Sequence, residues 1–390
     1  MSGQWFARGH RAASQRWMFL LGLMCGFHAL PAQAVDALVT AQYRGDPRGH
    51  FEDTTPEPAD GTCNRFRDFC TSALALPIAY QKVIGERDDG GREGYYLRLP
   101  ARQVVQVVHE TTGEVHSLRF EIQAYAQRVR GRDLLGVVRG GCTSSGSASG
   151  DHFAAHVLNP ARPEACWRSS IVGGRAELDW LAIKYRMVMP SPAKMTPGMY
   201  RGQLRYQVGE AGADFDLGDA FSNLSRSSVD IGFELDVQHT FAVEFAPGSE
   251  RAVLEPEGGW LQWINGGGPP QRLYRDLPMR LWSTGRFKVY KLCQYDVASH
   301  CGIRNPNNDQ VPVTVALTLP GGIEQAGTGG GRVTLPTGLA SALVFDPVTP
   351  VHNRPGQLHF QVERDAVRGM LAHAGTTYEG QVTVVFDADL

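Results

Sequence analysis

The chain has 390 residues, of which 42% are hydrophobic and 20% are charged, and its formal net charge is −2. This length accommodates two domains of roughly 150 to 200 residues, each with its own core. A mildly acidic chain without a basic run is a poor candidate for nucleic-acid binding, so no nucleic-acid partner is expected. Beyond the N-terminal segment, no apolar run approaches the length of a membrane span, and we expect a soluble mature protein.

The first 34 residues have the features of an export signal. Arg8, Arg11 and Arg16 form a basic region, residues 17–30 form a short apolar region, and Ala32-Gln33-Ala34 is a small-residue cleavage site. We therefore expect residues 1–34 to be a signal peptide. Its removal shifts the formal net charge from −2 to −5, because three arginines and no acids are lost.

Six cysteines follow this segment, and an even number of cysteines in an exported chain indicates disulfides. Sequence neighbours bracket loop-like stretches, so we expect the pairs Cys63–Cys70, Cys142–Cys166 and Cys293–Cys301. Metal binding is the alternative. It is disfavoured because no Cys-x-x-Cys motif occurs, and we expect no metal and no cofactor.

Strand-like patterns dominate the first half of the chain. Apolar runs or period-two alternation predict strands near 102–108, 118–124, 178–188, 200–208 and 233–237. A further alternation of Phe241, Val243 and Phe245 begins just beyond. The first domain should therefore end near residue 238, which gives an N-terminal domain of residues 35–238.

The second half, residues 239–390, repeats this style. Strands are predicted near 286–292, 311–319, 332–335, 343–345, 358–362 and 378–386, and glycine and proline clusters separate several of them. Helical turns are expected only at 194–199 and 365–372. Many short strands without helical periods predict an all-β protein with two tandem immunoglobulin-like β-sandwich domains.

One short sequence occurs late in both predicted domains. Tyr200-Arg201-Gly202-Gln203 and Tyr378-Glu379-Gly380-Gln381 each follow turn-prone residues and lead into a period-two strand. We interpret them as the same late strand of two similar domains. In the first domain, the strand carrying Phe233, Leu235 and Val237 should complete the sheet beside this strand.

Three motifs that resemble catalytic or ligand-binding sites favour ordinary surface loops. The sequence 146–150 lacks the serine position of a nucleophile elbow, and 326–331 lacks the Lys-Ser/Thr of a phosphate loop. The acids Asp214, Asp216 and Asp219 lack the spacing of an EF-hand calcium loop. The sequence therefore predicts no enzyme.

The ring between Cys63 and Cys70 contains Arg65, Phe66 and Arg67. Arginine beside an aromatic ring suits an anionic sugar, since the guanidinium binds carboxylate in a bidentate manner and the ring stacks. The alternative is that the phenylalanines are core and the arginines face solvent. Trp260, Trp263 and Trp282 leave a similar choice between a carbohydrate platform and packing, and packing is favoured.

The layout resembles the tip adhesins of chaperone-usher pili, in particular the cable-pilus initiator (CblD-like) family and the minor tip subunits of colonisation-factor fimbriae. The matching pieces are residues 192–203, residues 354–358 and the closing pattern Tyr378-x-Gly380-x-Val382-x-Val384-x-Phe386. The resemblance implies a fimbrial tip adhesin and assembly initiator. Its N-terminal domain binds a host or surface receptor, and its C-terminal pilin domain lacks a strand.

The resemblance further implies that a periplasmic chaperone and then the donor strand of the major pilin fill the gap, with an outer-membrane usher guiding assembly. Val382, Val384 and Phe386 are the expected groove residues. The expected location is the fimbrial tip at the cell surface, after secretion through the periplasm. Arg65 matches a receptor-site arginine of the family, whereas Val208-Gly209-Glu210 replaces a basic pair found there.

Two other functions remain open from the sequence. An exported carbohydrate-binding or carbohydrate-active β-sandwich protein would use the tryptophans as a platform and Asp214 and Asp216 as catalytic acids. A fimbrial chaperone or secreted sandwich protein would need no partner strand.

Overall fold

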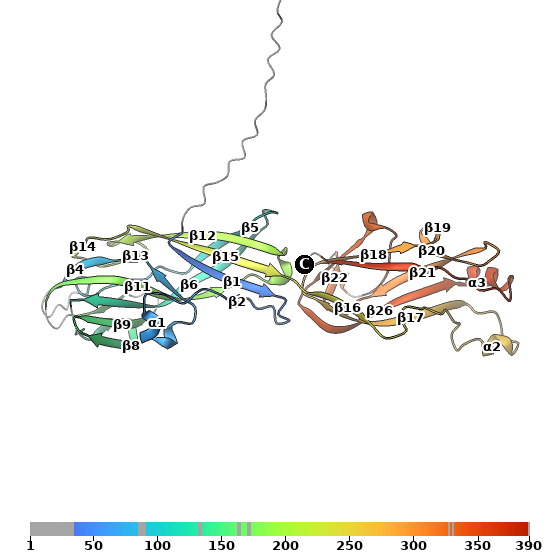
Figure 1. Ribbon diagram of the computed structural model, residues 1–390, viewed down its shortest axis with the longest axis horizontal. Helices are drawn as coiled ribbons and strands as arrows, with labels where there is room; N and C mark the ends of the chain where they lie inside the picture. The colour runs from blue at the N-terminus through green and yellow to red at the C-terminus, as the bar shows by residue number, and fades with distance from the viewer. Residues whose placement is uncertain are drawn as a thin grey trace, which may run out of the picture. The chain divides into compact units, whose positions relative to one another are not determined.

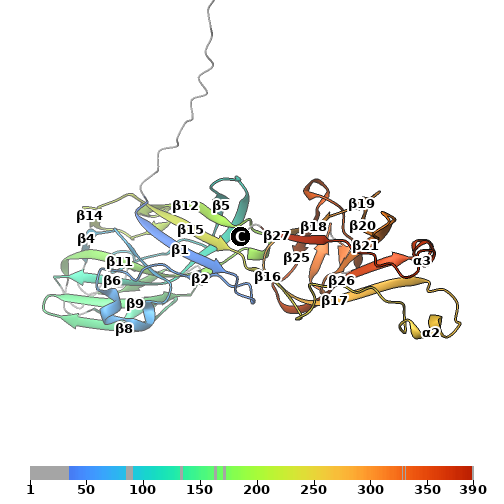
Figure 2. The ribbon, with the colours of Figure 1, turned by 45° about the vertical axis from the view of Figure 1, so that its right-hand side comes forward.

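The computed structural model describes residues 35–84, 91–131, 135–161, 165–169, 173–326, 328–329 and 331–388. The expected signal peptide lies outside these residues, as does part of the glycine-rich stretch 326–331. Strands account for 55% and helices for 7% of the chain, which confirms the all-β prediction. Figures 1 and 2 show curled sheets with a few short helical turns. None of the helices in the described residues has the length and apolar character needed to cross a bilayer.

The described residues of the N-terminal half, residues 35–238, form fifteen strands and three helical turns. The strands are β1 (Ala37–Arg44), β2 (Glu52–Asp53), β3 (Ala73–Leu76), β4 (Tyr80–Ile84), β5 (Gln103–His109), β6 (Val115–Arg130), β7 (Val138–Gly140), β8 (Cys142–Gly150), β9 (Phe153–Pro160), β10 (Cys166–Arg168), β11 (Gly174–Val188), β12 (Gly198–Gly209), β13 (Phe215–Asp216), β14 (Phe221–Ser222) and β15 (Ser228–Gln238). The helical turns are α1 (Thr62–Arg65) and two 3-10 turns, Arg67–Phe69 and Pro192–Lys194.

Most of these strands belong to one continuous curled sheet, in the order β14-β4-β11-β6-β5-β12-β15-β1-β2. The alternation predicted for residues 233–237 belongs to β15, which lies between β12 and β1. It is antiparallel to β12 and parallel to β1. Phe233, Leu235 and Val237 are buried and face Gly202, Tyr200 and Gly198 of β12 in the ladder. The prediction that this strand completes the sheet beside Tyr200 is confirmed.

The C-terminal half, residues 239–388, forms two main sheets around a second apolar core. Its strands are β16 (Phe241–Phe245), β17 (Arg272–Ser283), β18 (Phe287–Cys293), β19 (Asp296–Val297), β20 (His300–Arg304), β21 (Gln310–Thr318), β22 (Ile323–Gln325), β23 (Thr328–Gly329), β24 (Arg332–Thr334), β25 (Leu343–Pro347), β26 (Val351–Glu363) and β27 (Val382–Ala388). Its helices are α2 (Leu261–Ile264), α3 (Arg364–Leu371) and a 3-10 turn, Leu339–Ser341. The helical turn expected at 365–372 is α3.

Several predictions from local sequence were wrong. The helical turn expected at 194–199 lies at Pro192–Lys194, and further short turns occur outside the two predicted places. The Gly/Ser-rich stretch 146–150 belongs to β8, which pairs with β9, because main-chain ladder bonds and the neighbouring strand compensate for a weak strand composition. The twelve-residue strand β17 was missed, since Pro278 interrupts its pattern. Proline is tolerated there because β17 still pairs with β26 on either side of it.

The ladders between strands fall into two groups along the chain. Every pairing of named strands in the described residues joins two strands before residue 239 or two strands after it. Three disulfides, Cys63–Cys70, Cys142–Cys166 and Cys293–Cys301, are formed between sequence neighbours. Each one therefore constrains a loop inside one half of the chain.

Candidate functional site

β27 and β16 are edge strands of the C-terminal half, each with one neighbouring strand among the described residues. β27 is the last strand of its sheet and pairs only with β18, from Val382 opposite Cys293 to Ala388 opposite Phe287. β16 is the first strand of the other sheet and pairs only with β17. Unpaired N–H and C=O groups along such edges can hydrogen-bond an added strand.

A groove of about 1400 Å³ adjoins these edges. Its lining includes buried core side chains, among them Leu277 at 6% and Val367 at 0% exposure. The apolar lining includes Val382, Val384 and Phe386 of β27; Leu273, Leu277, Leu358 and Phe360 of β17 and β26; Val367, Met370 and Leu371 of α3; and Phe245, Val253 and Leu254 at and after the end of β16. An exposed apolar channel of this size favours binding of another chain.

The repeated sequence shows what is different about β27. In β12, Tyr206 and Val208 are 1% and 4% exposed; β15 pairs with β12 from Gly198 to Gln207, and Val208 lies opposite Phe215 of β13. At the equivalent positions of β27, Val384 and Phe386 remain only partly buried and line the groove. The same strand is therefore complete in the N-terminal half and lacks a neighbour in the C-terminal half.

The tyrosine that begins each repeat anchors the strand to a carboxylate. The Tyr200 hydroxyl donates to Glu114 at 2.9 Å, and the Tyr378 hydroxyl donates to Asp309. Burial, followed by the bond to Asp309, raises the pKa of Tyr378 to about 12. Each tyrosine therefore remains a neutral donor at physiological pH.

The glycine of each repeat is required by a close approach of backbones. A Cβ on Gly202 would lie 2.6 Å from the carbonyl oxygen of Gln106, and one on Gly380 would lie 2.6 Å from that of Gly302. Any larger residue would separate the strands. The Tyr-x-Gly motif is thus a structural device that fixes where each late strand enters its sheet.

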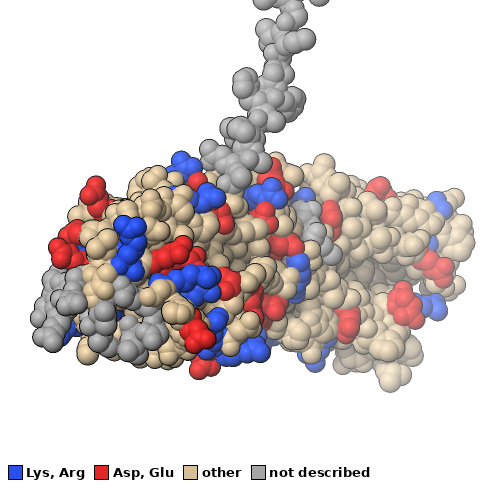
Figure 3. Space-filling model, turned by 60° about the vertical axis from the view of Figure 1, so that its left-hand side comes forward, with Lys and Arg blue, Asp and Glu red and all other residues tan. Residues whose placement is uncertain are grey.

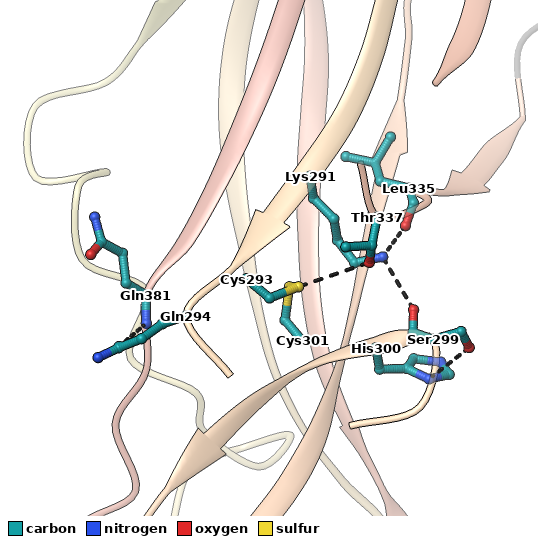
Figure 4. The surroundings of a disulfide bond; sticks show 9 residues. All are labelled: Lys291, Cys293, Gln294, Ser299, His300, Cys301, Leu335, Thr337 and Gln381. Atoms are coloured by element: carbon teal, nitrogen blue, oxygen red, sulfur yellow. Dashed lines mark hydrogen bonds between the residues drawn. A yellow bond between two sulfur atoms is a disulfide. The ribbon is translucent and has the colours of Figure 1, made fainter. Parts of the chain in front are cut away.

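A disulfide supports the beginning of β27 (Figure 4). Cys293 is the last residue of β18 and lies opposite Val382, and Cys301 belongs to β20. Next to it, the Gln294 N–H donates to the Gln381 carbonyl at 2.9 Å, and the Gln381 N–H donates to the Gln294 side chain at 3.0 Å. The disulfide therefore holds the strand that carries one wall of the groove.

Lys291 adds a buried polar contact to the same region. Its amine donates to the carbonyl oxygen of Leu335 and lies 3.5 Å from that of Ser299 (Figure 4). The side chain is 1% exposed, and this burial lowers the pKa of Lys291. The contacts link β18 to two loops and leave the groove side of β27 free.

The three tryptophans do not form one platform. Trp260 and Trp263 lie with ring centroids 6.0 Å apart and both line the groove. Trp282, on β17, instead makes an edge contact with His352. The pair is partly exposed and contributes to the lining of the groove, and Trp282 packs separately.

In the ring between Cys63 and Cys70, the phenylalanines pack against other side chains and the arginines face solvent, which is the alternative stated from the sequence. Phe69 is 4% exposed in a small cluster, and Phe66 packs against it. Arg65 and Arg67 are exposed, and the Arg65 guanidinium lies 5.0 Å from the centre of the Phe153 ring. The ring thus presents two cationic side chains to solvent from a fixed base.

The acids considered as catalysts have structural partners. Asp216 is 2% exposed and receives a bidentate bond from Arg92 at 2.9 and 3.0 Å, and Arg92 also binds Asp219. Asp216 is desolvated, yet the bond from Arg92 holds its pKa below the ordinary value. Asp214 accepts the backbone N–H of Gln207. Within the described residues, no cluster of His, Cys, Asp or Glu has the arrangement of a metal site.

Acidic and basic side chains alternate over much of the face of the N-terminal half shown in Figure 3. The same half contains ion pairs between strands, such as Arg205 with Asp230 at 2.6 Å. These pairs neutralise one another, so an arginine without an acidic partner is more informative about a ligand than an exposed arginine as such.

Sequence reasoning found one wall of the groove and missed the other. Val382, Val384 and Phe386 form a local period-two pattern. Leu254, Leu273 and Met370 come from separate segments, so no local signal connects them. The one sequence signal for the other wall was the alternation of Phe241, Val243 and Phe245. These residues form β16, which has a single neighbouring strand.

No family model and no curated protein sequence matches this chain. Among solved structures, it is similar to a mutant of the CFA/I adhesin CfaE of enterotoxigenic E. coli, with 10% identity over 90% of this chain and 91% of that chain and a TM-score of 0.27. A chaperone–tip adhesin complex of CFA/I fimbriae biogenesis gives 11% identity over 80% and 84%, with a TM-score of 0.25.

The CsuC–CsuE chaperone–tip adhesin complex of archaic chaperone-usher Csu pili from Acinetobacter baumannii gives 10% identity over 91% of this chain and 99% of that chain, with a TM-score of 0.22. All three structures contain tip adhesins. At these identities and TM-scores, the likeness does not establish the function of this chain.

Proposed function

We propose that this protein is a fimbrial tip adhesin and assembly initiator of the chaperone-usher type. The single observation that carries the proposal is the open apolar groove along β27, beside a strand whose twin β12 is covered by β15. The C-terminal half joins a fibre by accepting a donor strand, and the N-terminal half binds a host or surface receptor. No catalytic step is required.

The N-terminal half supplies a template for the missing strand. Val229, Ile231, Phe233, Leu235 and Val237 of β15 alternate along the strand and are at most 1% exposed. A donor with the same alternation, lying antiparallel to β27, would place its apolar side chains in the groove and its backbone on the free edge. Val382, Val384 and Phe386 are the receiving side chains in this proposal.

The proposal assigns partners in sequence. A periplasmic chaperone supplies a strand first, because an uncovered groove of this kind favours aggregation. The outer-membrane usher then presents the subunit, and the donor strand of the major pilin replaces the chaperone. The protein would follow the secretory route through the periplasm and remain at the fimbrial tip.

The test fuses a copy of residues 228–238 to the C-terminus of the mature chain through a short Gly-Ser linker. In the control fusion, the copies of Ile231, Phe233 and Leu235 are replaced by serine. Each buried apolar side chain contributes about 1.5 kcal/mol or more. Thermal unfolding of the C-terminal half should therefore shift upward by on the order of 10 °C relative to the control. Equal midpoints for the two fusions would refute the proposal.

A further inference from the structure

The outer face of the sheet in the N-terminal half is covered over only part of its area. On β6 and β11, the side chains of Ala124, Ala126 and Ala182 lie beneath the disulfide ring and pack with Phe69. The ring is held there by Lys184, whose amine donates to the Asp68 carbonyl at 2.9 Å. Beyond Lys184 the cover ends.

The ladder between β6 and β11 continues from this point. After a register shift between Lys184 and Tyr185, Arg186 lies opposite Glu121, and Val188 lies opposite Arg119. Arg119 in turn lies opposite Val104 of β5. A row of valine, arginine and valine therefore crosses three adjacent strands on one face.

The valines of this face are unusually exposed for a sheet. Val104 is 60% exposed and Val188 is 39% exposed. Four residues further along β5 and β6, Val108 and Val115 face each other at 41% and 54% exposure. Apolar side chains that gather on one face in this way favour an interaction surface.

Two exposed arginines add positive charge to the face. Arg119 and Arg186 are exposed, and neither forms an ion pair among the described residues, in contrast to paired arginines such as Arg205. Glu121, across from Arg186, is only 8% exposed. Lys184 reaches a backbone carbonyl and not an acid. The uncovered face is therefore both aliphatic and cationic.

We propose that this face, defined by Val104, Arg119, Arg186 and Val188, is the docking surface for an acidic protein segment. The proposal rests on the proposed function, in which the N-terminal half binds a receptor. Guanidinium groups bind carboxylates in a bidentate manner, and the flanking valines match aliphatic side chains. A protein partner is favoured over a sugar because the row offers aliphatic side chains and no aromatic ring for stacking.

The probe is a synthetic peptide of alternating glutamate and leucine, and its counterpart has glutamine in place of glutamate. Binding to the full mature protein is measured by titration calorimetry at two salt concentrations. The glutamate peptide should bind at least about tenfold more tightly than the glutamine peptide, and added salt should weaken it. Equal affinities for the two peptides would overturn the proposal.

Substitutions locate the contact. Arg119→Gln and Arg186→Gln should each weaken glutamate-peptide binding by roughly 3- to 30-fold, the loss of one charge-assisted contact. Val104→Ser should also weaken it. The matched controls are Arg48→Gln, whose arginine already pairs with Asp46, and Val83→Ser, at a valine that is 51% exposed elsewhere. Both controls should bind as the unmodified protein does.

Heparin, an acidic polysaccharide, separates the two classes of partner. If heparin binds more tightly than the peptide and loses affinity in Arg119→Gln and Arg186→Gln, the face recognises an acidic glycan and the proposal is wrong. If binding of the peptide survives both arginine substitutions, the location is wrong. Donor-strand fusion reports on the C-terminal half alone, so failure of this surface and failure of strand acceptance are distinguishable.

Discussion

Removal of the Cys293–Cys301 disulfide tests how the groove is held. The bond closes a loop with a sequence separation of 8, and the entropy of such a loop corresponds to roughly 2.5 kcal/mol of stability. Replacing both cysteines by serine should destabilise the C-terminal half by about that amount. It should also release the end of β18 that faces Val382.

The N-terminal half provides a matched control. Cys63–Cys70 has a sequence separation of 7, so the same relation gives a loss of roughly 2.4 kcal/mol there. Each double serine variant should therefore destabilise its own half to nearly the same extent in urea unfolding. The positions of the two bonds predict different effects on ligand binding.

A peptide with the sequence of residues 228–238 measures the difference. Its affinity for the groove should fall in the Cys293/Cys301 variant, because the start of β27 is no longer held in position. The Cys63/Cys70 variant should bind it as the unmodified protein does. If both variants bind the peptide equally well, the disulfide does not organise the groove, and this reasoning is refuted.

Two further predictions concern the N-terminal half. Burial lowers the pKa of His156 to about 3, so below pH 6.5 the unfolded chain binds a proton at this residue and the folded state does not. The free energy of unfolding should therefore fall by up to about 1.4 kcal/mol per pH unit as the pH decreases from 6.5 to 3. Urea titrations of His156→Gln should show a smaller dependence of stability on pH. Asp216→Asn removes the carboxylate beside partly buried Arg92 and should cost about 3 kcal/mol. Asp46→Asn, at the exposed pair with Arg48, should cost less than about 1 kcal/mol in the same urea assay. A flat pH profile for the unmodified protein, or equal losses for the two aspartates, would contradict these predictions.

For the last strand, β27, the sequence indicates the strand itself, and the tertiary structure shows whether a neighbouring strand covers it. The alternation of Val382, Val384 and Phe386 marks an amphipathic strand whatever surrounds it, because side chains alternate between faces. Whether such a strand is covered depends on a neighbour distant in sequence. β15 covers β12, and no strand among the described residues covers the free edge of β27.

The disulfides were predictable because each joins sequence neighbours. The strand β17 was not predicted because it contains Pro278. A local pattern does not show that the ladder with β26 continues on both sides of this proline. Arg119 and Arg186 also went unrecognised, because they are far apart in the chain, and Arg119 becomes a neighbour of Val104 and Val188 only through strand register.

The sequence by itself determined the all-β class, the local cysteine pairs and the repeated Tyr-x-Gly entry, because each depends on residues close together in the chain. Tertiary structure alone decided that the ring covers half of an outer sheet face. It also decided that segments from β16 to α3 combine with β27 into one groove. Both are consequences of strand pairing over long sequence separations, which side-chain periodicity does not encode.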